Sequence, residues 1–126
     1  MHVGIARLYV NDPERAKAFY TEKLGWEVRH DVPMGADMRW LSVAPPGAQT
    51  ALVLAKGFDD WTPDKVGGSS GIALEVDDVF KTAEALRAKG VEFIDEPSVE
   101  FFGGWARFKD SEGNEIGLHS PATSAR

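Results

Sequence analysis

The chain carries one pattern twice, and this repeat limits the folds open to it more than any other feature. Residues 5–25, IARLYVNDPERAKAFYTEKLG, are matched about half a chain later by residues 71–90, GIALEVDDVFKTAEALRAKG. Each copy has a short alternating run, an Asp, a stretch rich in Ala and charged residues, and a closing Gly. Alternation predicts a strand and the Ala-rich stretch predicts a helix. Each copy therefore predicts a strand followed by a helix.

Both predicted helices have a start signal and a stop signal. Asp12 can accept hydrogen bonds from the unpaired backbone amides of the first turn, and Asp77 or Asp78 can do the same for the second helix. Gly25 and Gly90 are typical of the left-handed residue that ends a helix. Both helices are therefore predicted to begin after an Asp and to end before a Gly.

The rest of each half continues in register. Positions 5 and 71, which begin the first strands of the two copies, are 66 apart. Positions 47 and 113, which lie in their last turns, are also 66 apart. Further strands are expected at 26–32, 38–43, 50–54, 91–94, 105–109 and 115–119. A strand, a helix and three strands, occurring twice, predict an α+β fold with curved mixed sheets.

Length and composition predict a single domain. The chain has 126 residues, 43% hydrophobic and 27% charged, which is ordinary for a globular protein with one core. We expect residues 1–126 to form one domain, with module one at 3–54, a linker at 55–70, module two at 71–119 and a frayed tail at 120–126. The linker is expected because its sequence has turn formers and no sustained period.

Charge and cysteine content exclude several kinds of partner. A formal net charge of −6 argues against nucleic acid or an anionic membrane, because binding phosphate needs a basic face. The absence of cysteine excludes disulfides, thiolate metal sites and cysteine nucleophiles. No apolar run approaches the roughly 20 residues that span a bilayer. Because the sequence shows no signal-peptide region, we expect a cytoplasmic protein.

Two stretches carry a family resemblance. NDPERAKAFYTEKLGWEV lies near the start and FKDSEGNEIGLH near the end. In this order, within a doubled βαβββ pattern, they resemble the vicinal oxygen chelate superfamily of glyoxalases, bleomycin resistance proteins and extradiol dioxygenases, over residues 3–119. The resemblance implies an α+β fold in which two βαβββ modules form a curved mixed-sheet cup with the helices on the outer face. It also implies a homodimer.

The resemblance also indicates where metal ligands would lie. In metal-using members they lie in the first and last strands of each module, at positions that correspond here to Ile5, Ala51, Gly71 and Gly117. None of these side chains can donate a lone pair, and divalent metals in such sites need several imidazole or carboxylate donors. We therefore expect no metal and no other cofactor, and none of the metal-dependent activities of the family.

Alternation along the first strands predicts which side chains line the cup. If the apolar row meets the helix, Arg7 and Tyr9 of module one and Glu75 of module two face the cavity. Buried charges need partners. An Arg7–Glu75 structural network and a polar floor for a ligand are both open.

The third strands add Trp105 and Arg107, with Arg39 and Leu41 as their expected counterparts in module one. A Trp and two arginines on one wall could hold a planar or anionic small molecule by stacking and charge-assisted hydrogen bonds. Trp105 could equally fill the space left by a missing metal and ligand.

The three histidines differ in their expected positions. His2 and His30 are expected to be solvated, whereas His119 shares a strand face with Gly117 and should point into the cup. No Ser has a His at motif spacing, so no catalytic residue is assigned.

Three functions remain open. The first is a glyoxalase- or bleomycin-resistance-like protein that binds a small organic molecule without metal, in a sequestering or resistance role. The second is a lyase, isomerase or dioxygenase-like enzyme of the same superfamily, with Glu75 or His119 as general acid or base. The third is a degenerate structural member with a filled cavity. The candidate ligand-binding residues are Arg7, Tyr9, Arg39, Glu75, Trp105, Arg107 and His119.

Overall fold

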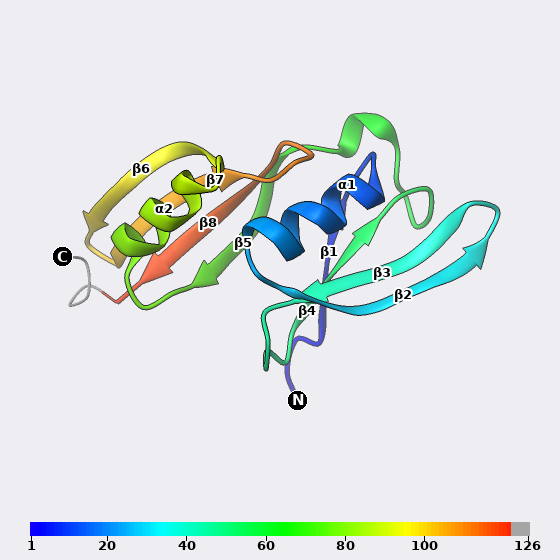
Figure 1. Cartoon of the computed structure of the whole chain (residues 1–126), viewed down its shortest axis with the longest axis horizontal. Helices are drawn as coiled ribbons and strands as arrows, with labels where there is room; N and C mark the ends of the chain where they lie inside the picture. The colour runs from blue at the N-terminus through cyan, green and yellow to red at the C-terminus, as the bar shows by residue number, and fades with distance from the viewer. Residues whose placement is uncertain (122–126) are drawn as a thin grey trace. The chain divides into compact units, whose positions relative to one another are not determined.

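The structure is a computed structural model that describes residues 1–121, and it divides into two compact units. Unit 1 runs from Met1 to Gly67 and unit 2 begins at Gly68. Each unit contains a four-stranded mixed sheet with a helix on one face, so the predicted α+β class and the doubled βαβββ order are confirmed (Figure 1). Neither sheet of the described chain closes into a barrel.

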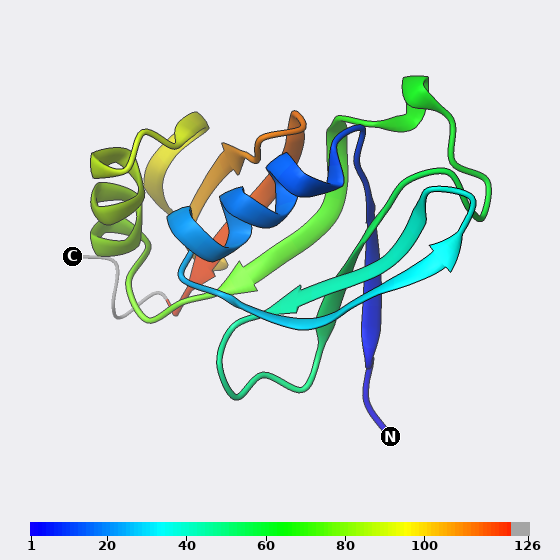
Figure 2. The same cartoon turned by 45° about the vertical axis from the view of Figure 1, so that its right-hand side comes forward.

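Unit 1 has the strand order β1-β4-β3-β2, with β1 parallel to β4 and the other neighbours antiparallel. Strands β2 and β3 run side by side as a long hairpin (Figure 2). The elements are β1 (Ile5–Tyr9), α1 (Pro13–Ala18), a π-helical extension (Phe19–Lys23), β2 (Glu27–Gly35), β3 (Met38–Ala44), β4 (Ala51–Ala55) and a 3-10 turn (Pro63–Lys65).

The first helix begins and ends where its sequence signals predict. The side chain of Asp12 accepts a hydrogen bond from the backbone amide of Arg15 at 3.0 Å, which satisfies one of the orphan donors of the first turn. Gly25 has a φ of 73°, the left-handed conformation that a residue with a Cβ adopts only at a cost. The chain can therefore turn back at this point to start β2.

The core of unit 1 lies between α1 and one face of the sheet. Leu8 of β1 and Val10, which follows β1, are buried there with Leu52 and Leu54 of β4, as alternation predicts. Tyr20 is fully buried and its ring lies 5.2 Å from that of Trp26. The opposite face of the sheet is not covered by α1, and its side chains are the ones available to form a site.

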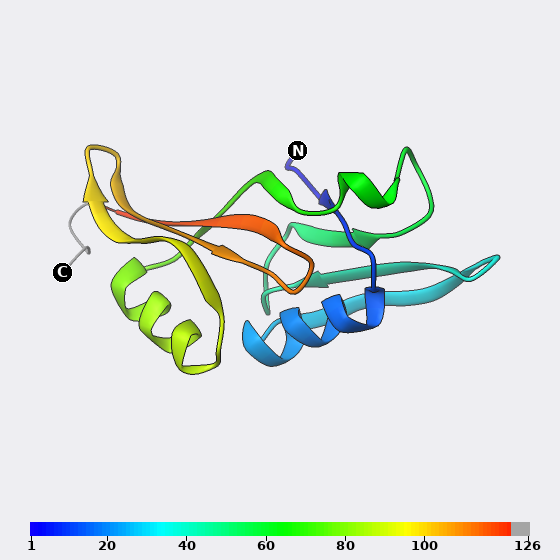
Figure 3. The ribbon, with the colours of Figure 1, turned by 90° about the horizontal axis from the view of Figure 1, so that it is seen from above.

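Unit 2 repeats the arrangement with the strand order β5-β8-β7-β6. Figure 3 shows α2 on one side of this sheet. Its elements are β5 (Gly68–Glu75), α2 (Val79–Ala88), β6 (Glu92–Glu100), β7 (Gly103–Lys109) and β8 (Asn114–Ser120).

The second helix has the predicted cap. The Asp78 carboxylate accepts hydrogen bonds from the amides of Phe80 at 2.9 Å and Lys81 at 3.3 Å. Val79 and Ala83 are buried against the sheet. Within residues 1–121, neither this helix nor any other is long and apolar enough to cross a membrane.

The turn between β7 and β8 is formed by residues 110–114, DSEGN, which have the pattern D-x-x-G-N. The buried Asp110 accepts hydrogen bonds from the amides of Glu112 at 2.8 Å and Asn114 at 2.9 Å, and from the Asn114 side chain at 3.1 Å. A carboxylate that satisfies several buried donors fixes the turn. It thereby sets the register of β8 against β7.

Three strands extend three or more residues beyond the ranges expected. Strand β2 continues through Pro33, and β6 continues through Pro97, because both are edge strands in which a proline nitrogen need not donate to a neighbour. Strand β5 begins at Gly68, inside the stretch expected to be linker, because Gly68 and Ser69 pair with the start of β8. Of the tail expected at 120–126, Ser120 belongs to β8, and positions 122–126 lie outside the described residues.

The third strands do not follow the spacing of 66. Ser42 pairs with Val53, and Trp105 pairs with His119, which lies 66 positions after Val53. Ser42 and Trp105 are therefore equivalent, and they are 63 apart. An odd change of register exchanges the two faces of a strand. The pairing of Trp105 and Arg107 with Arg39 and Leu41 was therefore wrong.

Candidate functional site

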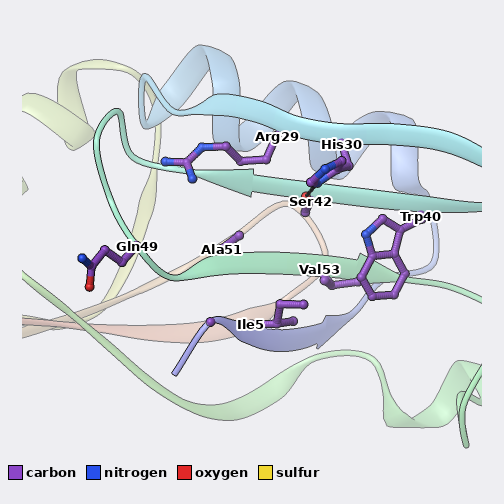
Figure 4. A pocket seen from close by; sticks show the side chains of 9 residues that line it. Ile5, Arg29, His30, Trp40, Ser42, Gln49, Ala51 and Val53 are labelled. Carbon is purple, nitrogen blue, oxygen red and sulfur yellow. Dashed lines mark hydrogen bonds between the residues drawn. The ribbon is translucent and has the colours of Figure 1, made fainter. Parts of the chain in front are cut away.

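Unit 1 contains a pocket of about 260 Å³ on the face of its sheet that α1 does not cover. Its floor consists of Ile5 from β1 and Ala51 and Val53 from β4, with Trp40 of β3 at one end (Figure 4). The full lining is Gly4, Ile5, Arg29, His30, Trp40, Ser42, Gln49, Ala51 and Val53. The site is therefore apolar along its floor, with an indole as the largest ring.

The polar groups of this pocket lie along β2 and β3. The His30 Nδ1 lies 3.4 Å from the Ser42 hydroxyl, and Ser42 is only 2% exposed. The Arg29 guanidinium donates to the carbonyls of Pro45 at 3.0 Å and Ala48 at 2.9 Å, and to Glu27 at 2.8 Å. Arg29 therefore holds the β3–β4 turn.

Arg7 and Tyr9 extend from the pocket floor along β1, and both are bonded to a later segment of unit 1. The Arg7 guanidinium forms an ion pair with Asp59 at 2.7 Å, and the Tyr9 hydroxyl donates to Asp60. The hydrogen bond from Tyr9, followed by the interaction with Lys65, lowers the pKa of Asp60 to about 2. The same bond to Asp60 raises the pKa of Tyr9.

Unit 2 has a shallower groove of about 230 Å³ on the equivalent face. Trp105 lies over Gly117, and a Cβ built on Gly117 would be only 2.4 Å from the indole Cη2. Beside it, Arg107 bonds to Asp95 at 3.0 Å and to Glu115 at 2.9 Å. The indole thus covers the part of the floor that stays open in unit 1.

His119 is bonded through both ring nitrogens. Its Nδ1 lies 2.7 Å from the Glu75 carboxylate, and its Nε2 lies 2.7 Å from the Phe102 carbonyl oxygen. Because both partners are acceptors, the arrangement favours the doubly protonated ring, and the Phe102 carbonyl followed by Glu75 raises the pKa of His119. His119 therefore ties β8 to β5 and to the β6–β7 turn.

The β6–β7 turn carries an aromatic cluster. The Phe101 and Phe102 rings lie 5.1 Å apart, and Phe102 lies 5.8 Å from Trp105 and 6.1 Å from the His119 ring. Phe101 is 93% exposed. The rings of Phe102 and His119 stack with an angle of 24° between their planes.

Comparison with known proteins decides the family. The model of the Glyoxalase/Bleomycin resistance protein/Dioxygenase superfamily matches residues 2–118. The chain belongs to this superfamily. It is 38% identical over 117 residues to YetH of Bacillus subtilis (strain 168), an alignment that covers 89% of this chain and 92% of that protein.

Two solved structures of similar sequence share the fold. TnmS3, described as an antibiotic binding protein from Streptomyces sp. CB03234, is 40% identical, with a TM-score of 0.83 and 96% of each chain covered. A member of the glyoxalase/bleomycin resistance protein/dioxygenase superfamily from Sphaerobacter thermophilus DSM 20745 is 34% identical, with a TM-score of 0.83, 95% of this chain covered and 97% of that one.

The residues at the superfamily's metal positions do not suit a metal ion. Ile5 and Ala51 are neighbours in the β1–β4 ladder and line the unit 1 pocket, while Gly71 and Gly117 line the unit 2 groove. None of the four offers a donor atom on its side chain, and the indole of Trp105 covers Gly117. Among residues 1–121, no three His, Cys, Asp or Glu side chains come together as a ligand set.

Arg39 lies on the other face of its strand from Trp40 and Ser42. Its guanidinium bonds to Glu14 of α1 at 2.9 Å and to both oxygens of Asp31, at 3.1 and 2.9 Å. Arg39, followed by Lys17, holds the pKa of Asp31 below its usual range. The expectation that Arg39 faces the cavity was therefore wrong, because the register of β3 differs from that assumed.

The seven predicted residues fall into separate groups. Arg7 and Tyr9 bond to residues of unit 1, and Glu75 bonds to His119 of unit 2. Trp105 and Arg107 line the unit 2 groove.

Sequence reasoning missed Trp40, Ser42 and His30, which line the unit 1 pocket. The signal was present in β3, where Leu41 and Val43 alternate with Trp40 and Ser42. Assigning the apolar pair to the helix side would have placed Trp40 on the open face.

Proposed function

We propose that this chain binds a planar, largely apolar organic molecule in the unit 1 pocket without a metal ion, in a sequestering or resistance role. The observation that supports this best is the pocket floor. Where metal-using relatives hold their ligands, this floor has Ile5 and Ala51, with the Trp40 indole at its end. Aromatic rings and aliphatic floors suit a flat ligand, which gains both stacking and burial.

The size and the polar groups of the pocket set limits on the ligand. A volume of about 260 Å³ lies just below the usual range of ligand pockets. It suits a planar group of about two fused rings, either alone or as part of a larger molecule. The His30–Ser42 pair on one side supplies hydrogen-bonding groups that would orient such a ring system.

Similarity to TnmS3 supports an antibiotic-type ligand. That protein is described as antibiotic binding, and it is 40% identical to this chain with 96% of each chain aligned. One fold of this kind hosts unrelated functions, so the main support for the proposed ligand is the pocket, and the similarity to TnmS3 adds to it.

The two alternative functions receive less support from the site. A general acid or base at His119 needs a ring nitrogen directed at a substrate, and both nitrogens bond to groups of unit 2. The filled-cavity alternative describes the groove of unit 2, where Trp105 covers Gly117, but not the open pocket of unit 1.

Fluorescence titration with N-phenylnaphthylamine, an uncharged fused-ring probe, tests this proposal. We expect Trp40→Ala to weaken binding about tenfold, because it removes the ring at the end of the pocket. Trp105→Ala, the matched change in unit 2, should alter the affinity less than about twofold. Equal losses in both variants, or binding that disappears after treatment with EDTA, would contradict the proposal. Thermal unfolding of each variant confirms that it is folded.

A further inference from the structure

The segment after β4 crosses the pocket-bearing face of unit 1. We call residues 57–65 the strap. Figure 3 shows its helical turn, Pro63–Lys65, on the opposite side of β2 and β3 from α1. The Phe58 ring lies 6.2 Å from that of Trp40, and the Trp61 indole donates to the Val10 carbonyl at 2.9 Å. The strap therefore contacts β3 and the residue that follows β1, both at the Trp40 end of the sheet.

Arg7 lies at the border between the pocket and the strap. It is the ladder partner of Val53 and lies two residues after Ile5 on the same face, and both of those residues belong to the pocket floor. Its guanidinium is bonded to Asp59 at 2.7 Å and lies over the Tyr9 ring at 4.9 Å. The positive charge of Arg7, at the border of this floor, is thus neutralised by a carboxylate of the strap.

We propose that Asp59 is the residue that sets the charge preference of the unit 1 pocket, by holding Arg7 away from ligand anions. The inference rests on the proposed function of this pocket. An anionic ligand that pairs with Arg7 would have to replace Asp59, so it would exchange one ion pair for another, with Asp59 and Asp60 repelling it. The other arginine, Arg29 of the lining, is already bonded to Glu27 and to two backbone carbonyls. An uncharged planar ligand does not have to break the Arg7–Asp59 ion pair, and the two strap carboxylates do not repel it. The pocket should therefore select uncharged planar molecules.

The pair is suited to a role in selectivity because it is accessible to solvent. The side chains of Arg7 and Asp59 are 45% and 49% exposed, so little stability depends on the bond between them. The Asp59 backbone has a φ of 57°, a left-handed conformation that Asn tolerates as well as Asp does. Asp59→Asn therefore removes the charge without changing the preference of the backbone.

Two probes with one ring system test the inference. N-phenylnaphthylamine is uncharged, and anilinonaphthalene sulfonate is the same skeleton with one sulfonate. Only binding that Trp40→Ala weakens about tenfold is counted, which excludes binding to exposed rings elsewhere. We expect Asp59→Asn to raise the affinity for the sulfonate about fivefold, since Arg7 becomes able to bind it, and to leave the affinity for the uncharged probe within about twofold.

Two further variants separate a direct effect from a general change in charge. Asp64→Asn makes the same charge change in the strap, at a carboxylate whose hydrogen-bond partner is Thr62, and should give less than a twofold gain. Adding Arg7→Gln to Asp59→Asn should abolish the gain. An equal gain in Asp64→Asn, or a gain that persists without Arg7, would overturn the inference.

The two proposals fail in different ways. If the wild-type protein shows no Trp40-dependent binding of the uncharged probe, the proposed function of the pocket is wrong. If that binding is present and Asp59→Asn leaves the ratio of the two affinities unchanged, the role of Asp59 alone is wrong.

Discussion

The two units of this chain have the same order of strands and helix, yet their open faces differ. In unit 1 the Trp of the third strand stands at the end of the pocket and leaves Ala51 open, whereas in unit 2 it lies over Gly117. The hydrogen-bond register explains the difference, because Trp105 is equivalent to Ser42 and not to Trp40. Moving one indole by two residues along a strand therefore decides whether this part of the floor is open or covered.

The comparison also shows that the positions expected for metal ligands differ between the two units. In unit 1 the side chains of Ile5 and Ala51 leave space above the floor, and in unit 2 Gly117 allows the Trp105 ring to lie on it. Backbone architecture is the same in both, so function follows from the side chains on the open face.

The largest effect should come from Gly117→Ala. The added methyl would lie 2.4 Å from the Trp105 indole, so the ring must shift, and we expect the free energy of unfolding to fall by about 2 kcal/mol. Urea unfolding measures this loss. In a Trp105→Ala background the same change should cost less than about 0.5 kcal/mol. An equal cost in both backgrounds would show that the indole does not lie on Gly117.

A smaller effect is expected for Arg39→Met. Arg39 bonds to Asp31 and Glu14 on the helix side, partly shielded from solvent, so its loss should lower the free energy of unfolding by about 1 kcal/mol. The affinity for N-phenylnaphthylamine should not change, because Arg39 lies on the other face from Trp40. Weakened probe binding in this variant, with its unfolding curve unchanged, would reverse the assignment of faces in β3.

In unit 2, stability should depend on the protonation of His119. Its pKa is raised above the ordinary 6.5, so the stabilisation is fully present below pH 6.5 and is lost as the pH rises through the folded-state pKa. Glu75→Gln should lower that pKa while the bond to the Phe102 carbonyl keeps it elevated. Titration of the His119 ring protons by NMR measures both. A ring that titrates below pH 6.5 in the wild-type protein would contradict the double hydrogen bond.

The smallest effect concerns the strap in acid. The pKa of Asp60 is about 2, below the ordinary 3.8, so its bonds to Tyr9 and Lys65 contribute stability above pH 3.8 that is lost as the pH falls through about 2. Trp61 fluorescence should report release of the strap in that range. Tyr9→Phe removes the main cause of the shift and should move the release to higher pH. Release at the same pH in both proteins would argue against the Tyr9–Asp60 bond.

Much of the fold could be predicted because it depends on local signals. The caps at Asp12 and Asp78, and the turn at Asp110, are formed by residues within a few positions of each other, and the structure confirms all three. The extents of β2 and β6 could not be predicted from Pro33 and Pro97. A proline ends a strand only where a neighbouring strand needs the backbone N–H that proline lacks.

The site was harder to predict because it depends on non-local register. The spacing of 66 was taken from the first strands and the last turns, but 11 positions separate Ser42 from its partner Val53 and 14 separate Trp105 from His119, so the third strands are offset by 63. Because of that difference, the spacing of 66 assigned Arg39 to the wrong face and did not indicate Trp40. The partners of Arg7 and Tyr9 lie in the strap, about 50 residues away in sequence, and no local pattern indicates them. The homodimer and the cytoplasmic location stay predictions.

Chemical-shift mapping by NMR, with N-phenylnaphthylamine added to the isotopically labelled chain, tests the central claim most directly. The claim is that the open floor of unit 1 is the ligand site. We predict that the largest amide shifts occur at Ile5, Ser42 and Ala51, in metal-free buffer. Shifts confined to the groove of unit 2, around Trp105 and Gly117, would contradict it.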